Sequence, residues 1–471
     1  MVSSVLLPSG HGTEQDEQVR LGLDARDRAS RGSHGQWSIP ADRPDPISLL
    51  EEQAQSRVPD LVPIRYGRML VSPFSFFRGA AIIMTADLSP TPVSGFDVQL
   101  CGDAHAANFG IFAGPDRQLV FDVNDFDETM VGPWEWDVKR LATSLEIAGR
   151  ENGYSDADRG TIVLSCVRTY RDTMREFADM GALAGWYARL DATTMQRWRN
   201  AISSKQVSRT RKAVAKAQAK DSTRALAKLT SPNGGQPRFA SDPPLLTPVQ
   251  EIAGGADLEE LRSFLEGVVE NYAESLQPHL RHLLRNYRLV DMARKVVGVG
   301  SVGTRAWAIL LVGRHAHDPL VLQAKEAEAS VIERYLRPSS YSHHGERVIG
   351  GQRLMQAASD ILLGWVSVLG VDGVTRDYYV RQLWDQKGSV DLQTMVPTGM
   401  KVYGDMCGWT LARAHARSGN PIAISSYLGN GDSFPRAIQA FASAYATLNE
   451  QDYQMLVRAA RLNRVPVIQG V

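Results

Sequence analysis

Two short acidic segments, each following a run of apolar residues, constrain this chain more than any other feature. The first covers residues 102–108 (GDAHAAN) and follows residues 98–101, whose alternating apolar side chains predict a strand. The second covers residues 122–127 (DVNDFD) and follows the apolar residues 119–121. Neither segment has a helical or strand-like pattern, so we predict that both are loops at strand ends. If the two loops meet, they form a pocket lined by carboxylate and amide oxygens.

The spacing of these polar residues favours phosphoryl-transfer chemistry. Asp103 and Asn108 are five positions apart (108 − 103), and Asp125 follows beyond one predicted hairpin. In the D-x-x-x-x-N loop of kinases, the Asp accepts the proton of the attacking hydroxyl and the Asn binds a metal ion, while a later Asp-Phe pair supplies a second metal carboxylate. Oxygen ligands of this kind suit Mg²⁺ or Mn²⁺ rather than Zn²⁺. The predicted site residues are Asp103 and His105 as catalytic residues, Asn108, Asp125 and Asp127 as metal ligands, and Asp122 as an alternative to Asp127 in support of the metal.

In composition, the second acidic segment also matches two other kinds of acidic loop. Acids at strand ends are common turn formers, so residues 122–127 could be a solvated turn. An EF-hand loop is excluded, because Phe126 would stand at the fifth, ligand position and Asp127 at the glycine position.

The first segment and the Asp-Phe pair together resemble the G-D-x-H-x-x-N…D-F motif of aminoglycoside phosphotransferases, choline kinases and related members of the protein-kinase-like superfamily. The resemblance implies ATP and Mg²⁺ (or Mn²⁺) as cofactors, and an acceptor that is more often a small hydroxyl compound than a protein. Many relatives have His before the Gly-Asp where this chain has Cys101, a difference that bears on the hydrogen bonding within the loop. The resemblance also implies that Asp137 braces the catalytic loop, although on the sequence alone Asp137 is a suitable helix N-cap.

A second motif, residues 298–303 (GVGSVG), matches G-x-G-x-x-G. Both Rossmann dinucleotide sites and kinase phosphate loops use this pattern, but the Rossmann glycines open a helix. Here the β-rich residues 307–312 and 320–325 predict strands, which favours the kinase type. Gly298, Gly300 and Gly303 are then predicted to cover the phosphates, with Lys325 binding them; an edge-strand lysine that protects against aggregation is the alternative. Four acids are candidates for the partner of Lys325: Glu326, Glu328, Glu333 and Glu346.

The order of the two motifs is reversed relative to ordinary kinase-like enzymes, in which the glycine loop precedes the catalytic loop. Circular permutation explains this order, since it is tolerated where chain ends lie close at a surface. We therefore predict an α+β, bilobal, protein-kinase-like fold with permuted lobe order. The predicted parts are an N-terminal arm that is only partly ordered (1–60), a helical catalytic region (61–290), a β-rich nucleotide-binding region (291–392) and C-terminal helices that pack back on the helical region (393–471).

Basic residues occur in two places that bear on partners. Arg65, Arg68 and Arg78 precede the acidic segments and are predicted to be surface charges, with a phosphate clamp as the alternative. Residues 205–228 carry eight basic side chains against one acid and predict a solvated basic helix. No aromatic residues are interleaved among them, so nucleic-acid binding is not favoured.

Overall composition narrows the class of protein. Lys and Arg together number 52, as do Asp and Glu, so the formal net charge of zero provides no general attraction to nucleic acid or to an acidic membrane. The three cysteines, Cys101, Cys166 and Cys407, are widely separated and indicate a reducing compartment. With no signal-peptide pattern and no long apolar run, the chain is predicted to be cytoplasmic. The sequence does not predict the oligomeric state.

Taken whole, the sequence resembles a bacterial family catalogued as domain of unknown function 2252, a label that carries no activity. The leading hypothesis is an ATP- and Mg²⁺-dependent phosphotransferase. Alternatives are a non-catalytic nucleotide-binding protein, an AMP transferase on the same site, a metallophosphoesterase and a Rossmann oxidoreductase. The stretches that carry the family resemblance are 68–70 with 72–74, 101–105, 298–303, 323–327 and 411–417.

Overall fold

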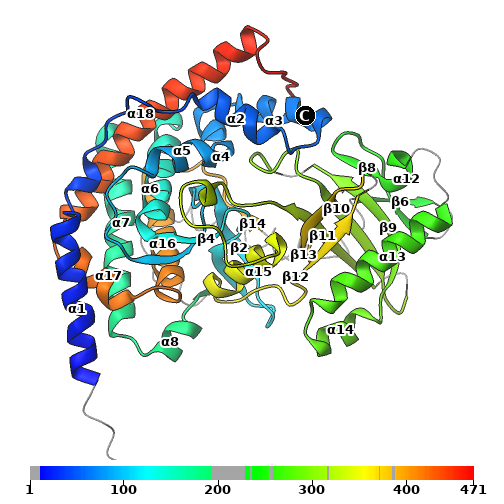
Figure 1. Cartoon of the computed structure of the whole chain (residues 1–471), viewed down its shortest axis with the longest axis horizontal. Coiled ribbons are helices and arrows are strands. Elements are labelled where there is room, and N and C mark those ends of the chain that lie inside the picture. The colour runs from blue at the N-terminus through cyan, green and yellow to red at the C-terminus, as the bar shows by residue number, and fades with distance from the viewer. Residues whose placement is uncertain are drawn as a thin grey trace, which may run out of the picture.

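The computed structural model describes residues 11–191, 229–233, 236–253, 258–296, 298–315, 318–370, 372–383 and 388–470. It has a helical part and a part built on a six-stranded antiparallel sheet, which lie side by side (Figure 1). The predicted α+β class is therefore confirmed, and every strand pairing described is antiparallel. The basic segment 205–228 lies outside the described residues.

The helical part combines helices from both ends of the chain. Side-chain caps mark several of its helix starts: Ser72 accepts a hydrogen bond from the Ser75 N–H, and Ser155 accepts one from the Asp158 N–H. The first group of helices is α1 (His11–Arg28), α2 (Pro46–Ala54), α3 (Val62–Met69), α4 (Pro73–Gly79), α5 (Ala81–Leu88), α6 (Trp134–Glu151), α7 (Asp156–Asp179) and α8 (Ala182–Tyr187). The second group is α16 (Pro397–Ala416), α17 (Pro421–Leu428) and α18 (Ser433–Arg461).

The six-stranded sheet has the order β12-β13-β11-β10-β9-β8. Alternate residues of its central strand face opposite sides, as strand geometry requires. Ile309 and Leu311 pack with α13 and α14, whereas Ala308 and Leu310 face a separate apolar cluster. The strands are β8 (Leu246–Pro248), β9 (Arg288–Lys295), β10 (Ala306–Val312), β11 (Pro319–Ala327), β12 (Gly364–Leu369) and β13 (Thr375–Gln382), and the associated helices are α12 (Val249–Ile252), α13 (Leu258–Glu274), α14 (Pro278–Leu284) and α15 (His344–Met355).

Three smaller sheets complete the described elements. The first acidic segment follows β1, as predicted, and its residues Ala106–Asn108 form a short 3₁₀ helix. The second was predicted to be a loop, but β3 extends through Asp122 and Val123, so only residues 124–127 lie beyond the strand. The smaller sheets are β1 (Asp97–Leu100) with β4 (Met130–Pro133); β14 (Gly388–Ser389), β2 (Phe109–Ala113), β3 (Leu119–Val123) and β5 (Leu190–Asp191); and β6 (Thr230–Asn233) with β7 (Gln236–Phe239).

The boundaries of the two parts differ from the predicted ones. A division at residue 290 would cut through β9, and the sheet already includes β8. The predicted N-terminal arm contains α1, which packs on α17, and α2, which packs on α5 and α18. Residues 393–471 supply α16 and α18, which pack against α6 and α7.

Two further findings limit what the fold can be. Residues 306–312 form a strand, so the glycine-rich motif does not open a helix in the manner of a Rossmann site. No helix within the described ranges is long and apolar enough to cross a membrane.

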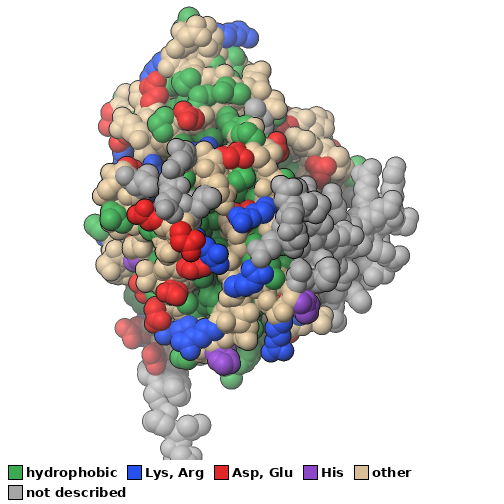
Figure 2. All heavy atoms as spheres, turned by 90° about the vertical axis from the view of Figure 1, so that its right-hand side faces the viewer, with side chains coloured by type: hydrophobic (Ala, Val, Ile, Leu, Met, Phe, Trp, Pro, Cys, Tyr) green, Lys and Arg blue, Asp and Glu red, His purple; other side chains and the backbone are tan. Residues whose placement is uncertain are grey.

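On the face that Figure 2 shows, acidic and basic side chains lie close to one another, so the described surface there carries both signs of charge.

Candidate functional site

One cavity of about 160 Å³ brings the two sequence motifs together. Its lining includes residues of both acidic segments and of the glycine-rich turn between β9 and β10, which are far apart in the sequence. It also includes residues of α4 and of the segment before α3. The predicted site residues on its wall are Asp103, His105, Asn108, Asp125, Asp127, Gly298 and Gly300.

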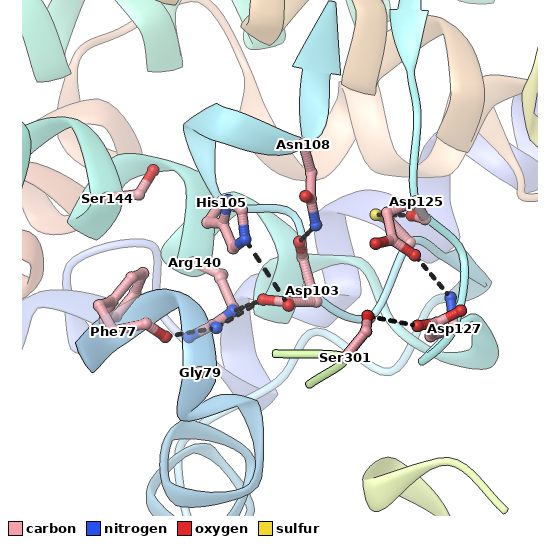
Figure 3. Close-up of polar contacts among 12 residues, drawn as sticks. Phe77, Gly79, Asp103, His105, Asn108, Asp125, Asp127, Arg140, Ser144 and Ser301 are labelled. Carbon is pink, nitrogen blue, oxygen red and sulfur yellow. Dashed lines mark hydrogen bonds and ion pairs between the residues drawn. The ribbon is translucent and has the colours of Figure 1, made fainter. Parts of the chain in front are cut away.

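The carboxylate of Asp103 is held by a buried arginine. Arg140, on α6, contacts Asp103 Oδ1 through Nε at 2.6 Å and Nη2 at 2.5 Å (Figure 3). The same guanidinium donates to the Phe77 carbonyl and lies 4.2 Å from the Phe77 ring centroid. Burial raises the pKa of Asp103 above its ordinary value, and the opposing effect of Arg140 does not cancel this rise. Asp103 is therefore a fixed carboxylate with raised proton affinity.

The loop around Asp103 is closed by its own hydrogen bonds. Asn108 Nδ2 donates to the Asp103 carbonyl at 2.7 Å, which leaves Oδ1 as the atom of this amide that can bind a metal ion (Figure 3). The Asn124 N–H donates to the Asn108 carbonyl at 2.8 Å and so ties the two acidic segments together. Gly102 has a φ of +84°, and a Cβ there would collide with the Glu128 carbonyl. The backbone conformation and the close packing at this position therefore explain why the G-D-x-H motif has a glycine here.

Asp137 contacts the start of this loop from α6. Its Oδ2 accepts from the Cys101 N–H at 2.6 Å, and its Oδ1 accepts from the Gly102 N–H at 3.0 Å. The predicted N-cap role of Asp137 is wrong, because Pro133 is the N-cap residue of α6 and Asp137 lies within the helix. His415 is completely buried, with Nε2 3.3 Å from Asp137 Oδ2. These contacts position the backbone that carries Asp103.

His105 is buried beside Asp103 rather than exposed to solvent. Its Nε2 lies 3.8 Å from Asp103 Oδ2, and its Nδ1 has no hydrogen-bond partner among the described residues. Burial lowers the pKa of His105 well below its ordinary value, and the charges of Arg78 and Arg140 lower it further. His105 is therefore a neutral imidazole at pH 7, able to orient Asp103 but not to act as a cation.

Lys325 joins the sheet to the second acidic segment. Its ammonium forms an ion pair with Asp127 Oδ2 and donates to Ser301 Oγ at 2.6 Å, while the Tyr379 hydroxyl donates to Asp127 Oδ1 at 2.7 Å. The register of the sheet places Lys325 opposite Tyr379 on the neighbouring strand. Burial acts to raise the pKa of Asp127, but Lys325 and Tyr379 outweigh it and hold the pKa below its ordinary value.

The partner of Lys325 differs from all four acids proposed on the sequence. Glu326, the nearest of them in sequence, instead contacts Arg305 at 3.2 Å and Arg376 at 3.3 Å. Neighbouring residues on a strand face opposite sides, so Glu326 cannot share the face of Lys325.

The glycine-rich turn packs against residues before the acidic segments. Gly298 and Gly303 have φ values of +63° and +94°, which favour glycine. The Val58 N–H donates to the Gly303 carbonyl at 2.8 Å, and Arg68 Nη1 donates to the Gly298 carbonyl at 2.5 Å. The turn therefore contacts the helical part of the molecule through its backbone.

Two of the predicted metal-binding acids are engaged elsewhere. Asp122 faces away from the cavity, where it pairs with Arg413 at 2.6 Å and accepts from the Ala357 N–H at 3.0 Å. Asp127 has both oxygens occupied by Lys325, Ser301 and Tyr379. Among the described residues, the Asp125 carboxylate accepts one long hydrogen bond, from the Asp127 N–H at 3.3 Å, while its backbone carbonyl accepts from the Cys101 thiol at 3.3 Å (Figure 3). Asn108 and Asp125 thus remain as the two candidate metal ligands.

Residues that the sequence prediction missed are mainly arginines. Arg347, on α15, donates to the carbonyls of Thr129, Asp127 and Glu328, and it is almost completely buried. Arg65, predicted to be a surface charge, is completely buried, and Arg78 lies in the wall of the cavity. No periodic or spacing signal marks these residues, because their partners come from distant segments.

Comparison with known proteins gives one finding. The model of a family described as an uncharacterized protein conserved in bacteria (DUF2252) matches residues 57–459. No curated protein and no solved structure matches the chain. The matched residues include both acidic segments, the glycine-rich turn and Lys325, and of the residues that line the cavity only Gln53 lies outside the matched range.

Proposed function

The chain belongs to this bacterial family, DUF2252, and we propose that it is an ATP- and Mg²⁺-dependent phosphotransferase with a circularly permuted, protein-kinase-like fold. The observation that carries the proposal is the shared cavity. Asp103, Asn108 and Asp125 line it together with residues of the glycine-rich turn, of which Figure 3 shows Ser301. Kinase-type chemistry requires these two groups of residues around one nucleotide and places no condition on their order in the chain.

The glycine-rich turn and Lys325 are suited to bind phosphates. The turn connects two antiparallel strands, and Lys325 lies on the third, an arrangement that protein kinases use to cover and hold ATP phosphates. Lys325 is not itself on the cavity wall, but it pairs with Asp127 and donates to Ser301, which both lie on that wall. A phosphate group would offer Lys325 an anionic partner in addition to Asp127 or in exchange for Ser301 Oγ.

The donor set fits Mg²⁺ better than a metal bound entirely by protein. Within the described ranges, no group of three or more His, Cys, Asp or Glu side chains is arranged to hold a metal ion. Mg²⁺ is commonly bound through one or two carboxylates together with substrate phosphates and water. Asn108 Oδ1 and Asp125 would hold it here, and the bound ion would neutralise charge on the phosphates.

Asp103 is suited to orient the acceptor hydroxyl and to accept its proton. Its raised pKa gives it the proton affinity that a general base needs, and Arg140 fixes its position. A small hydroxyl compound is the favoured acceptor, on the analogy with the G-D-x-H phosphotransferases. The His105 side chain contributes as a neutral neighbour that restricts Asp103.

The first test is a thermal-shift experiment with ATP, ADP, GTP and NAD⁺, each with and without Mg²⁺. A ligand that binds only the native state raises the melting temperature. Wild-type protein should be stabilised by ATP in a Mg²⁺-dependent manner, and Lys325→Ala should lose the effect. Lys401→Ala is the matched control, because Lys401 pairs with Asp405 on α16, away from the cavity. Stabilisation by NAD⁺ alone, or no response to any nucleotide, would refute the proposal.

A non-catalytic nucleotide-binding protein is the second candidate, and one observation favours it: Arg140 already occupies Asp103 Oδ1. A screen of hydroxyl compounds that measures both ADP and pyrophosphate separates the possibilities. Phosphoryl transfer releases ADP, whereas AMP transfer on the same site releases pyrophosphate. ATP binding with neither product across the screen would favour the non-catalytic protein.

A further inference from the structure

We propose that Arg78 binds the terminal phosphate of the nucleotide, so that α4 supplies a phosphate-recognition arginine to the site. This inference rests on the proposed function and adds a residue that the G-D-x-H and glycine-rich motifs do not contain. Three points support it: the position of Arg78 in the cavity wall, its lack of a hydrogen-bond or ion-pair partner among the described residues, and the fit of a guanidinium group to phosphate oxygens.

Arg78 lies between the two motifs. It is in the last turn of α4 and lines the same cavity as Asp103 and Asp125. Its backbone carbonyl packs against the glycine-rich turn, since a Cβ added to Gly300 would stand 3.1 Å from the Arg78 oxygen. A phosphate held under the glycine-rich turn and directed toward Asp103 would therefore pass beside Arg78.

Among the described residues, the guanidinium of Arg78 has no hydrogen-bond or ion-pair partner, unlike the neighbouring buried arginines. Arg140 is paired with Asp103, and Arg57, the other arginine of the cavity wall, donates to the Val302 carbonyl at 2.5 Å. Arg78 makes no hydrogen bond or ion pair with another described residue, and its buried Nε is unsatisfied. Burial lowers the pKa of Arg78, while the charges of Asp103 and Asp125 counteract this effect. Arg78 is half-buried, so its guanidinium is only partly hydrated, and an anionic ligand would compensate for the lost hydration.

Guanidinium groups match phosphate oxygens through parallel N–H donors, and an Arg retains its charge in proteins. ATP and ADP differ by the one phosphate that is transferred. A residue that contacts this phosphate contributes to the binding of ATP and not to that of ADP. This difference distinguishes Arg78 from Lys325, whose loss should weaken the binding of both nucleotides.

The test is calorimetric titration of ATP and of ADP, with Mg²⁺, into wild type and Arg78→Ala. We expect ATP affinity to fall about tenfold or more while ADP affinity changes by less than about twofold, as for loss of a hydrogen bond to a charged group. Arg78→Lys, which keeps the charge but not the planar fork, should retain part of the ATP preference. Arg436→Ala, at an exposed position on α18, is the control and should leave both affinities unchanged.

The ratio of the ATP and ADP affinities is measured within one variant, so a partial loss of folded protein does not affect it. An equal loss for both nucleotides, or an unchanged ratio, would overturn the role of Arg78 while leaving the proposed function intact. If Arg78→Ala does not fold, the same ratio in Arg78→Lys decides. A wild-type protein that binds neither nucleotide would overturn the proposed function, and the inference with it.

Discussion

At the scale of single residues, buried arginines hold the side chains and backbone around the cavity in place. Arg140 and Arg347 are almost completely buried, and the guanidinium group of each donates hydrogen bonds to groups beside the cavity. A buried charge is tolerated only when hydrogen bonds compensate for its lost hydration. Arg140 therefore restricts the movement of the Asp103 carboxylate, and Arg347 restricts the movement of the backbone at Asp127.

Replacing Asp103 by Asn should abolish turnover while leaving ATP affinity within a few-fold of wild type. The change removes the proton acceptor but keeps the size of the side chain. Product release and calorimetric ATP binding measure the two effects separately. Asp116→Asn is the control, because Asp116 is an acid at a strand end that lies in the exposed turn between β2 and β3. Full activity in Asp103→Asn would show that Asp103 is not the proton acceptor and that its role is to form the turn at the strand end.

The folded protein should lose stability in mild acid because its buried His34 resists protonation. It is buried against Tyr427, with Nε2 2.6 Å from the hydroxyl, and burial lowers its pKa to about 3, with a further contribution from Lys139. Between pH 6.5 and about 3, the unfolded chain binds a proton at His34 that the folded chain does not bind. Stability is therefore fully present above pH 6.5 and is lost as the pH falls below it, by about 2 kcal/mol at pH 5.

The check on His34 is urea unfolding of wild type and His34→Gln at pH 7 and pH 5. The variant should be less stable at pH 7 and should lose less stability on acidification. His279→Gln, at an exposed position on α14, is the control. An identical pH dependence in wild type and His34→Gln would contradict the assignment.

At the scale of elements, the sequence predicted what local patterns encode. The apolar runs at 307–312 and 320–325 predicted β10 and β11, because residues buried on both faces of a sheet are continuously apolar. The sheet begins earlier than predicted, since the three-residue strand β8 is too short to carry a pattern.

The parts of the candidate site that could not be predicted depend on contacts between distant segments. Asp137 has the residue type of an N-cap, and only the fold shows that its carboxylate accepts from the backbone of Cys101 and Gly102. The partner of Lys325 is 198 positions away in the chain, whereas sequence reasoning considered the acids that follow it. Arg78 was predicted to be a surface charge, with a phosphate clamp as the alternative, and only the fold shows that it lies on the cavity wall.

Helix α15 should be coupled to the second acidic segment through Arg347. Replacing Arg347 by Lys removes a guanidinium that serves three backbone carbonyls, so unfolding free energy should fall by about 3 kcal/mol or more. Amide hydrogen exchange over residues 127–129 should accelerate. Arg353→Lys on the same helix is the matched control, with one contact to the Leu363 carbonyl and an expected loss of about 1 kcal/mol. Equal effects from the two variants would argue against this coupling.

At the scale of the whole molecule, the cavity lies where the helical part and the sheet part meet. Three kinds of contact join them there: the pairing of Asp127 with Lys325, the backbone hydrogen bond from Val58 to Gly303, and the contact of Arg57 with the Val302 carbonyl. Each involves either the glycine-rich turn or the strand that carries Lys325. The proposed nucleotide site is therefore also the junction of the two parts, so ligand binding and the packing of the parts should be linked.

A double-mutant cycle on Asp127 and Lys325 tests this junction in the absence of ligand. Removing one member of a buried ion pair leaves the other uncompensated, so Asp127→Asn and Lys325→Met should each lower the unfolding free energy by about 3 kcal/mol or more. The double variant leaves neither charge unpaired, and its loss should be smaller than the sum by at least about 1 kcal/mol. The pair Lys401 and Asp405 lies within one helix, with Lys401 on the surface, and should show a coupling below about 1 kcal/mol in the same urea-unfolding assay. Additive losses at Asp127 and Lys325 would show that the two parts are held together without this ion pair, and would also remove the reason to expect nucleotide binding to stabilise their packing.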